Sequence, residues 1–339
     1  MDINPALEKF MHSIPLFELV EREDILELLR LLRQVNLEAG EVLFRQGEVG
    51  KCMWVLGAGA QVALSVRMDD LDKPLAGLGP GETVGEMSLI DDAQRSASAT
   101  VLSSGMAYCI EAMDFDVLRD EFMPAAFRIL RKMAADMCQR LRMVSVQIVP
   151  DGPGVGEGAA AGRPPAGDRI KSSTLEEFAP FKGAPATARL ALAQMLTELT
   201  LEPGEVVFRE GEPSDAAYFL VEGEVETRRQ GKVYISLGPG SMFGLVSVID
   251  RGSRSATCVA KSTARVWRLA SGDFERLFAL GNRFAFKLVD LVARQLAGNL
   301  RQANATLVGK GLEPPAVPTG QSLSALDLGV DLAFDEIMG

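Results

Sequence analysis

The sequence predicts a fold that is mainly β with flanking helices, arranged as two small antiparallel barrels in tandem. The first observation behind this fold class is internal repetition, which indicates a duplicated domain. The segment 39–48 (AGEVLFRQGE) matches 203–212 (PGEVVFREGE), and 78–90 (LGPGETVGEMSLI) matches 237–249 (LGPGSMFGLVSVI). The second observation is that short runs rich in Val, Leu, Phe and Ile alternate with Gly and Pro turns in each copy, which is typical of barrel strands.

The elements of the first copy follow from these runs. A helix is predicted over 23–33, and strands are predicted over 41–44, 53–56 and 62–66. The offset between the copies shrinks after Gly59 and Gly223, and the extra residues of the first copy fall around 68–73, a charged stretch. A hairpin loop is expected there, because loop tips tolerate insertions.

A long helix with an apolar seam is predicted after each barrel, because apolar residues recur there in a three-four heptad alternation. The two seams are Phe127, Leu130, Ala134, Met137, Leu141, Val144 and Ile148, and Phe286, Val289, Ala293, Leu296, Leu300, Ala303 and Leu307. Two uses stay open. The seams either pack back on the barrels of the same chain or pair with a second chain as a homodimer.

The segment between the copies predicts a linker. Residues 150–168 are dominated by Gly, Ala and Pro and include no aromatic residue, so they bury too little apolar area to offset their ordering entropy. The expected organisation is therefore a first domain at 1–149, a flexible linker at 150–171, a second domain at 172–311 and an acidic tail at 312–339.

Composition excludes several function classes. The chain has 339 residues, 47% hydrophobic and 24% charged, with a net charge of -11, and an acidic surface argues against nucleic acid as the main partner. No stretch reaches the length of a membrane span and the N-terminus has no signal-peptide pattern, so we expect a cytoplasmic protein without a membrane partner.

The cysteines and the histidine do not suggest a metal or catalytic site. Cys52, Cys109, Cys138 and Cys258 lack metal or redox spacing and are expected to be reduced core residues. With His12 the only histidine, a catalytic triad or a metal site is not expected.

Residues that suit an anion gather at 85–98. Gly85 lets the backbone approach a ligand at the entrance to a short helical turn. The amides of Glu86, Met87 and Ser88 are expected to point outward, and free N–H groups at a helix start favour an anion. Arg95 adds a permanent positive charge, worth about 1.5–3 kcal/mol as a charge-assisted hydrogen bond.

Two residues complete this predicted first site. Ser96 and Ala97 are expected to follow on a strand, where they offer backbone amides and one hydroxyl. Gly85, Glu86, Arg95 and Ala97 occur together inside a repeat, which makes the full string a stronger signal than a lone Gly-Glu pair or a lone Arg.

The string resembles the phosphate-binding cassette of the cyclic-nucleotide-binding domain, the β-roll (jelly-roll) module of bacterial cyclic AMP receptor proteins and kinase regulatory subunits. The resemblance covers both copies. It implies that Glu86 accepts a hydrogen bond from the ribose 2′-hydroxyl and that the ligand is cyclic AMP, with cyclic GMP left open because of Ser96. It further implies that the closing helix reads the purine, with Met133, Asp136, Met137, Arg140 and Leu141 as candidates.

The second copy departs from this pattern at one position. It keeps Gly244, Arg254 and Ala256 but has Leu245 in place of the Glu that the family uses for ribose. An unpaired ribose hydroxyl should cost about 1–3 kcal/mol, so we expect weak binding or none there. The residues of this doubtful second site are Gly244, Val246, Ser247, Arg254, Ser255 and Ala256.

These patterns favour a cytoplasmic cyclic-nucleotide sensor that regulates an unidentified protein partner. Ligand at the first barrel would draw the helix that begins near Pro124 over the site, and this movement would change a partner surface. A ligand-free tandem scaffold is the alternative. An enzyme is not expected, because catalytic motifs, metal ligands and a cofactor signature are missing. No recognition helix fits after Thr306, and no kinase pseudosubstrate precedes the first copy. The tail at 322–339 is read either as a helix that folds on a partner or as a disordered end.

Overall fold

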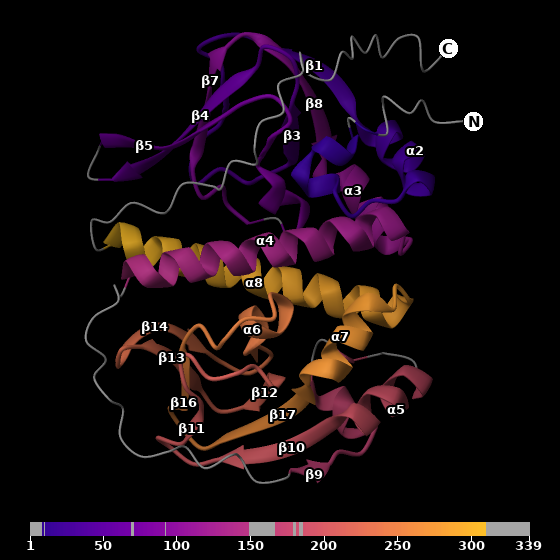
Figure 1. Cartoon of the computed structure of the whole chain (residues 1–339), viewed down its shortest axis with the longest axis vertical. Helices are drawn as coiled ribbons and strands as arrows, with labels where there is room; N and C mark the ends of the chain where they lie inside the picture. Colours follow the sequence, from indigo (N-terminus) through magenta and orange to yellow (C-terminus); the bar gives the residue numbers. More distant parts are fainter. Residues whose placement is uncertain are drawn as a thin grey trace. The chain divides into compact units, whose positions relative to one another are not determined.

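A computed structural model describes residues 9, 11–68, 71–91, 93–148, 167–178, 181–182 and 186–309 of the chain. These residues form two compact units, and the boundary between the units falls inside a long helix, between Met133 and Ala134. In the described residues, each unit contains two antiparallel sheets with helices beside them (Figure 1). The prediction of a mainly β fold with flanking helices is therefore confirmed.

The first unit is built from short strands. Its elements are η1 (Pro15–Phe17), α2 (Arg22–Leu31), β1 (Arg33–Leu37), β2 (Val42–Phe44), β3 (Cys52–Leu56), β4 (Gln61–Met68), β5 (Leu71–Leu78), β6 (Thr83–Val84), η2 (Glu86–Leu89), β7 (Ser98–Ser103), β8 (Gly105–Glu111), α3 (Ala112–Asp120) and α4 (Pro124–Ile148). The strand orders in its two sheets are β1-β8-β3-β6 and β2-β7-β4-β5. The second unit begins within α4, so the part of this helix from Ala134 onward belongs to it.

The second unit repeats this arrangement. Its elements are β9 (Asp168–Arg169), η3 (Thr174–Glu177), α5 (Ala186–Met195), β10 (Leu196–Leu201), β11 (Val206–Phe208), β12 (Ala216–Glu222), β13 (Val225–Arg229), β14 (Lys232–Leu237), β15 (Met242–Phe243), α6 (Leu245–Ile249), β16 (Thr257–Ala260), β17 (Ala264–Ala270), α7 (Ser271–Ala279) and α8 (Arg283–Gly309). The strand orders are β15-β12-β17-β10-β9 and β11-β16-β13-β14.

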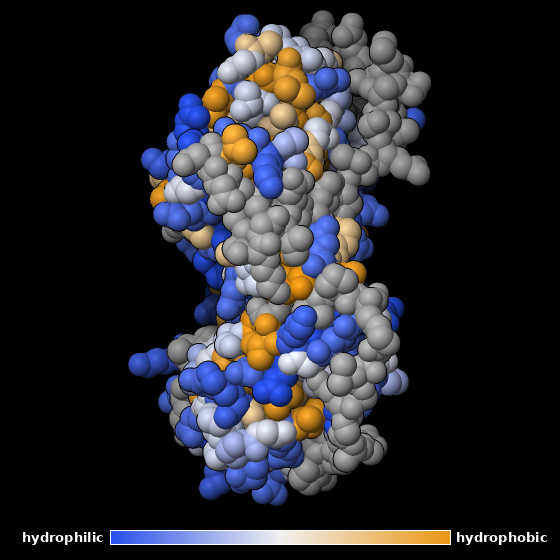
Figure 2. Space-filling model, turned by 90° about the vertical axis from the view of Figure 1, so that its left-hand side faces the viewer, coloured by the Kyte–Doolittle hydropathy of each residue, from blue (hydrophilic) through white to orange (hydrophobic). Residues whose placement is uncertain are grey.

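Each barrel encloses an apolar core, because alternate side chains of a strand point to opposite faces of the sheet. The first core holds Leu37, Phe44, Leu56, Val62, Val84 and Val101 among others. The second holds Leu199, Phe208, Tyr218, Val225, Phe243 and Val266 among others. On the face in Figure 2, hydrophilic residues predominate and apolar residues form small separate patches.

The predicted elements match the structure with small differences. The helix expected over 23–33 ends at Leu31, because Arg33 already pairs with Cys109 in the ladder between β1 and β8. Strands β4 and β5 flank the expected hairpin tip, whose residues 69–70 lie outside the described residues. Residues 150–166 of the linker expected at 150–171 and the tail at 312–339 also lie outside them, so the predictions for these residues stay untested. The end of the expected linker differs, because Asp168–Arg169 form β9 and pair with Glu198 and Thr197 of β10.

The residues of both helical seams are buried within the single chain, at Phe127, Leu130, Ala134, Met137, Leu141, Val144 and Ile148, and at Phe286, Val289, Ala293, Leu296, Leu300, Ala303 and Leu307. Burial within one chain fits packing inside the chain, and pairing with a second chain stays a prediction. None of the helices in the described ranges has the length and hydropathy that a membrane span needs.

Candidate functional site

The first cassette begins at a glycine whose conformation other residues rarely adopt. Gly85 has φ 81° and caps the N-terminus of η2, as expected for a backbone that turns sharply into a helical turn. A Cβ at Gly85 would collide with the Arg95 guanidinium, and one at Gly50 would lie 2.6 Å from the Ser88 Cβ and 3.1 Å from Arg95 Cζ. The two glycines therefore make room for the arginine.

Arg95 is held rigidly under η2. Its side chain is 8% exposed, Nη1 donates to the Gly85 carbonyl (2.9 Å) and Nη2 donates to the Cys52 carbonyl (2.5 Å). The guanidinium also lies over the Phe44 ring, 4.0 Å from its centroid, which favours a cation. Its Nε is buried and has no hydrogen-bond partner in the described part of the chain. A buried donor of this kind is suited to an anion.

The charge on Arg95 persists despite burial. Burial lowers the pKa of Arg95 from its usual 12.5. The nearby Cys52 and Glu86 side chains have the opposite, smaller effect and raise this pKa. A guanidinium remains protonated at neutral pH under such shifts. Glu86, at the first position of η2, is half-buried and close enough for its charge to act on Arg95. A carboxylate and a guanidinium that influence each other electrostatically are therefore both present at the start of η2.

Two details of the predicted first site are wrong. The Ser88 amide does not point outward, since it donates to the Gly85 carbonyl (3.1 Å), and the Ser88 hydroxyl contacts the carbonyls of Gly85 and Cys52. Ser96 and Ala97 lie in a bend before β7 rather than on a strand. Met87 is half-buried on η2, and Ser96 is exposed. That these residues bind a ligand stays a prediction.

The second cassette repeats the backbone but not the charge balance. Gly244 has φ 76° and caps α6, and Arg254 is only 1% exposed. Arg254 donates to the carbonyls of Gly244 (3.1 Å) and Ala216 (2.8 Å), and its guanidinium lies 3.9 Å from the Phe208 centroid. Two further acceptors complete the set, the Ser247 hydroxyl (3.0 Å) and the Asp215 carboxylate (2.7 Å).

Asp215 is a residue of the second cassette that the sequence analysis did not identify. Asp215 also accepts a hydrogen bond from Arg268 (3.0 Å). Burial raises the pKa of Asp215, but the hydrogen bond from Arg268 and the charge of Arg254 have the larger combined effect. The pKa of Asp215 is therefore lowered from its usual 3.8. The equivalent residue in the first unit is Lys51, because the Lys51 carbonyl accepts from Ala112 as the Asp215 carbonyl accepts from Ser271. When the repeat pair 39–48 and 203–212 is extended by three residues, Lys51 aligns with Asp215, so a positive side chain in the first copy corresponds to a negative one in the second.

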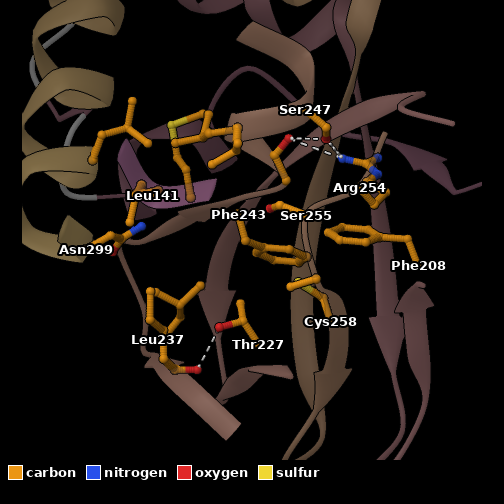
Figure 3. A pocket seen from close by; sticks show the side chains of 17 residues that line it. Leu141, Phe208, Thr227, Leu237, Phe243, Ser247, Arg254, Ser255, Cys258 and Asn299 are labelled. Atoms are coloured by element: carbon orange, nitrogen blue, oxygen red, sulfur yellow. Dashed lines mark hydrogen bonds between the residues drawn. The ribbon is translucent and has the colours of Figure 1, made fainter. Parts of the chain in front are cut away.

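The remaining residues of the second site are enclosed. Leu245 and Ala256 are buried, at 3% and 4% exposure, while Val246 and Ser255 are half-buried. The cavity beside them has a volume of about 50 Å³. Small-molecule pockets measure roughly 300–1,000 Å³, so this cavity is too small for a nucleotide as it stands. Figure 3 shows Phe208 and Phe243 on one side of it and Leu141 on the other.

Helices close this cavity. Leu141 of α4 and Leu296 and Asn299 of α8 line it together. Figure 3 labels Leu141 and Asn299. Leu141, expected to read the purine of the first ligand, thus belongs to the second unit and lines the cavity there. The other expected purine readers on α4 divide between the units, with Met133 in the first and Met137 in the second, both buried.

The same part of α4 is tied to the second cassette by polar contacts. Arg142 donates to both carboxylate oxygens of Asp250 (2.5 and 2.9 Å) and to the Ser253 carbonyl (2.8 Å). Arg229 of β13, which is 8% exposed, donates to the Ser145 hydroxyl (3.1 Å). A bidentate arginine pair is geometrically specific, so it holds α4 in one register on the loop at 250–253.

Among the described residues, no group of His, Cys, Asp and Glu could hold a metal ion. His12, the residue on which such a site would depend, lies near the Val20 carbonyl, 2.7 Å from its Nε2. Cys138 and Cys258 are buried as expected, whereas Cys52 and Cys109 are half-buried rather than core residues.

Comparisons with known proteins agree with the repeat. The chain is 24% identical over 264 residues to the cAMP-dependent protein kinase regulatory subunit of Yarrowia lipolytica, covering 77% of this chain and 58% of that subunit. It is 38% identical over 123 residues to a putative potassium channel protein of Rhodopseudomonas palustris, covering 35% of this chain and 30% of the channel. The chain thus spans less than two thirds of the curated relatives it matches.

Solved structures include the regulatory domain of Toxoplasma gondii PKA with cAMP, at 21% identity and a TM-score of 0.33, covering 83% of this chain and 95% of that one. The cyclic nucleotide-binding domain model matches residues 34–122 and 198–280, which together make up about half of the chain. These two matches coincide with the two barrels. The chain belongs to the cyclic nucleotide-binding domain family and carries the domain in tandem.

Proposed function

We propose that this chain is a sensor that binds one purine cyclic mononucleotide at the first cassette and regulates a protein partner. The observation that carries the proposal is Arg95, a nine-tenths buried cation with a partnerless Nε, placed beside Glu86 at the start of η2. A cyclic phosphate supplies an anion for Arg95, and the adjacent ribose supplies a hydroxyl for Glu86. One small ligand satisfies both groups.

The rigidity of this cradle favours binding. Arg95 is already oriented by two carbonyls and the Phe44 ring, so little side-chain entropy remains to be lost when an anion arrives. The desolvated position also strengthens its attraction for a phosphate oxygen. We therefore expect the first cassette to bind with higher affinity than an exposed arginine would allow.

The second cassette is proposed to remain empty. Its arginine is neutralised by Asp215, its ribose acceptor is replaced by Leu245, and its cavity measures only about 50 Å³. The expected stoichiometry is one ligand per chain.

Cyclic AMP is the proposed ligand. The relatives include cAMP-dependent protein kinase regulatory subunits, and the Toxoplasma gondii domain was solved with cAMP. Cyclic GMP is the competing ligand, because the exposed Ser96 hydroxyl can pair with a guanine edge. The ratio of the two affinities decides between them.

Regulation is proposed to pass through α4 to a cytoplasmic protein partner, of which a protein kinase is the class suggested by the relatives. This helix begins at Pro124 in the first unit and ends beside the cassette loop of the second, where Arg142 holds Asp250. Because α4 is one continuous helix, a ligand-induced movement of its first part either moves the later part as well or bends the helix between them. A homodimer through the seams would first have to open the intrachain packing that buries them.

Titration calorimetry of the purified chain with cyclic AMP and cyclic GMP tests the proposal. We expect one site per chain with cyclic AMP and weaker binding of cyclic GMP. If neither ligand binds the folded protein at tens of micromolar, the chain is a scaffold and the sensor proposal is wrong. Thermal stabilisation that grows with ligand concentration and disappears in Arg95→Gln is the second readout.

A further inference from the structure

Two thiols meet on the wall of the first cassette. Cys52 on β3 and Cys109 on β8 lie diagonally across neighbouring antiparallel strands, because Cys52 pairs with Glu111 and Trp54 pairs with Cys109. Each thiol shifts the pKa of the other, and both are free and half-buried. The second barrel has Ala216 and Arg268 at the equivalent positions, because Tyr218 pairs with Arg268 there. Of the two barrels, only the first therefore contains this thiol pair.

The backbone of Cys52 is part of the Arg95 cradle. Its carbonyl accepts from Arg95 Nη2 (2.5 Å) and from the Ser88 hydroxyl (2.9 Å). The preceding carbonyl, of Lys51, accepts from the Ala112 amide at the start of α3 (2.7 Å). A shift of β3 at Cys52 therefore moves an acceptor on which the orientation of Arg95 depends.

The two sulfurs differ in acidity, and this difference suits a nucleophile and its partner. The neighbouring Cys109 thiol lowers the pKa of Cys52 to about 7, with the charge of Arg95 acting in the same direction and burial opposing it. The pKa of Cys109 is raised by Cys52 and by burial. A thiolate is the reactive form of cysteine, so Cys52 is the nucleophile of the pair.

The other two cysteines provide internal controls. Burial raises the pKa of Cys258 to about 12 and also raises the pKa of Cys138. Both are buried in the second unit, and buried apolar cysteines are inert. Reactivity is thus expected at one position out of four in the chain.

We propose that Cys52 and Cys109 form a peroxide-sensitive thiol pair whose oxidation weakens ligand binding at the first cassette. The Cys52 thiolate attacks hydrogen peroxide, and with one proton taken up this gives Cys52 sulfenic acid and water. The Cys109 thiol then attacks that sulfur, the S–O bond breaks, and a disulfide and a second water form. Peroxide is the oxidant, and each disulfide consumes one peroxide and both thiol hydrogens.

Closure of this disulfide must move the strands. Diagonal neighbours in an antiparallel pair lie about 7–8 Å apart at Cα, whereas disulfides span about 5.5–6 Å. Drawing Cys52 toward Cys109 displaces its carbonyl from Arg95 Nη2. We expect the affinity for cyclic AMP to fall about tenfold, as for the loss of one charge-assisted hydrogen bond. This part of the inference rests on the proposed function, whereas the oxidation itself does not.

The first experiment follows oxidation without any nucleotide. The reduced full chain is treated with hydrogen peroxide between pH 6 and 8.5, and intact mass and peptide mapping follow the products. We expect loss of two hydrogens and a Cys52–Cys109 cross-link, forming faster as the pH rises through about 7. Cys109→Ser should accumulate a sulfenic acid at Cys52 that dimedone captures. Cys52→Ser should form neither product, whereas Cys258→Ser should behave as wild type. Equal reaction of Cys52→Ser, or modification mapped to Cys138 or Cys258, would overturn the assignment.

The second experiment measures the coupling to the cradle. Trp54 on β3 stacks with Phe44 at 5.6 Å and lies 5.6 Å from Arg95, so its fluorescence in a Trp267→Phe background reports on the cradle. Oxidation should shift this fluorescence and weaken cyclic AMP binding about tenfold, and dithiothreitol should restore both. A cross-link with unchanged fluorescence and affinity would refute the coupling. If the reduced chain binds no nucleotide, the fluorescence shift alone decides the coupling, and the failure belongs to the proposed function.

Discussion

The two cassettes share a backbone and differ in what neutralises their arginine. In the first unit Arg95 donates to two carbonyls, whereas in the second Arg254 donates to two carbonyls and also to the Asp215 carboxylate. The Nε of both arginines is buried without a hydrogen-bond partner in the described residues, so the carboxylate is what differs. A carboxylate at that position satisfies the charge that a ligand phosphate would otherwise satisfy. The comparison therefore predicts that the second barrel keeps its fold without a ligand, because an internal anion takes the place of an external one.

The strongest test of this comparison removes each arginine charge in turn. Arg95→Gln should weaken cyclic AMP binding roughly 10–150-fold, as expected for a charge-assisted hydrogen bond to phosphate. Arg254→Gln, its matched control, should leave ligand affinity unchanged and instead lower the free energy of unfolding, because it removes a buried guanidinium that pairs with Asp215 and donates to two carbonyls. Calorimetry and urea unfolding measure the two effects. If Arg254→Gln also weakens binding, the second cassette takes part in it.

The next test opens the second cavity. Leu141→Ala removes a side chain that is 6% exposed, so the free energy of unfolding should fall by about 2–4 kcal/mol. Ligand stoichiometry should stay at one per chain, because Leu245 and the Asp215–Arg254 pair remain. Leu130→Ala, on the part of α4 in the first unit, controls for the stability loss. A stoichiometry of two in Leu141→Ala would mean that the leucine alone keeps the second cassette empty.

A smaller effect is expected at the ribose acceptor. Glu86→Gln should weaken cyclic AMP about tenfold, within the range for an imperfectly paired polar group. The variant and wild type should bind 2′-deoxy cyclic AMP almost equally, since that ligand lacks the hydroxyl. Leu245→Glu in the second unit should not create a site. Calorimetry measures the affinity of wild type and Glu86→Gln for both nucleotides. If the substitution lowers the affinity for both nucleotides equally, Glu86 has a structural role only.

The smallest expected effect concerns the pH dependence of the Asp215–Arg254 pair. The pKa of Asp215 is lowered in the folded chain, so ionised Asp215 stabilises the fold above about pH 4 and this contribution disappears as the pH falls further. Asp215→Asn should cost about 1 kcal/mol at pH 7, since Asp215 is partly exposed, and should approach wild type below pH 4. Unfolding followed by Trp267 fluorescence in a Trp54→Phe background measures this. A constant difference across pH would exclude the carboxylate charge as its cause.

Local patterns predicted most of the fold. The repeats, the strand runs and the position of Gly85 all depend on neighbours close in sequence, and the structure has them within a few residues of the predicted positions. The bend at Ser96 was missed because a strand pattern does not fix where pairing begins. Element boundaries depend on the partner strand as well as on the strand itself.

Long-range contacts account for the rest. Asp215 meets Arg254 across 39 residues, and the Cys52–Cys109 pair depends on the register of β3 on β8. The seam of α4 shows that one face is apolar but not which barrel covers it, and Leu141 lines the cavity of the second unit. Each of these facts requires knowledge of which segments become neighbours in space.

The ion pair in the second barrel also has a consequence for evolution. Leu245→Glu alone places a carboxylate where a 3% exposed leucine now lies, and removing Asp215 alone leaves a 1% exposed arginine without its counter-ion. Each single reversal lowers stability before any nucleotide can bind. A ligand site in the second barrel would therefore need both changes together, because each one alone is expected to lower stability.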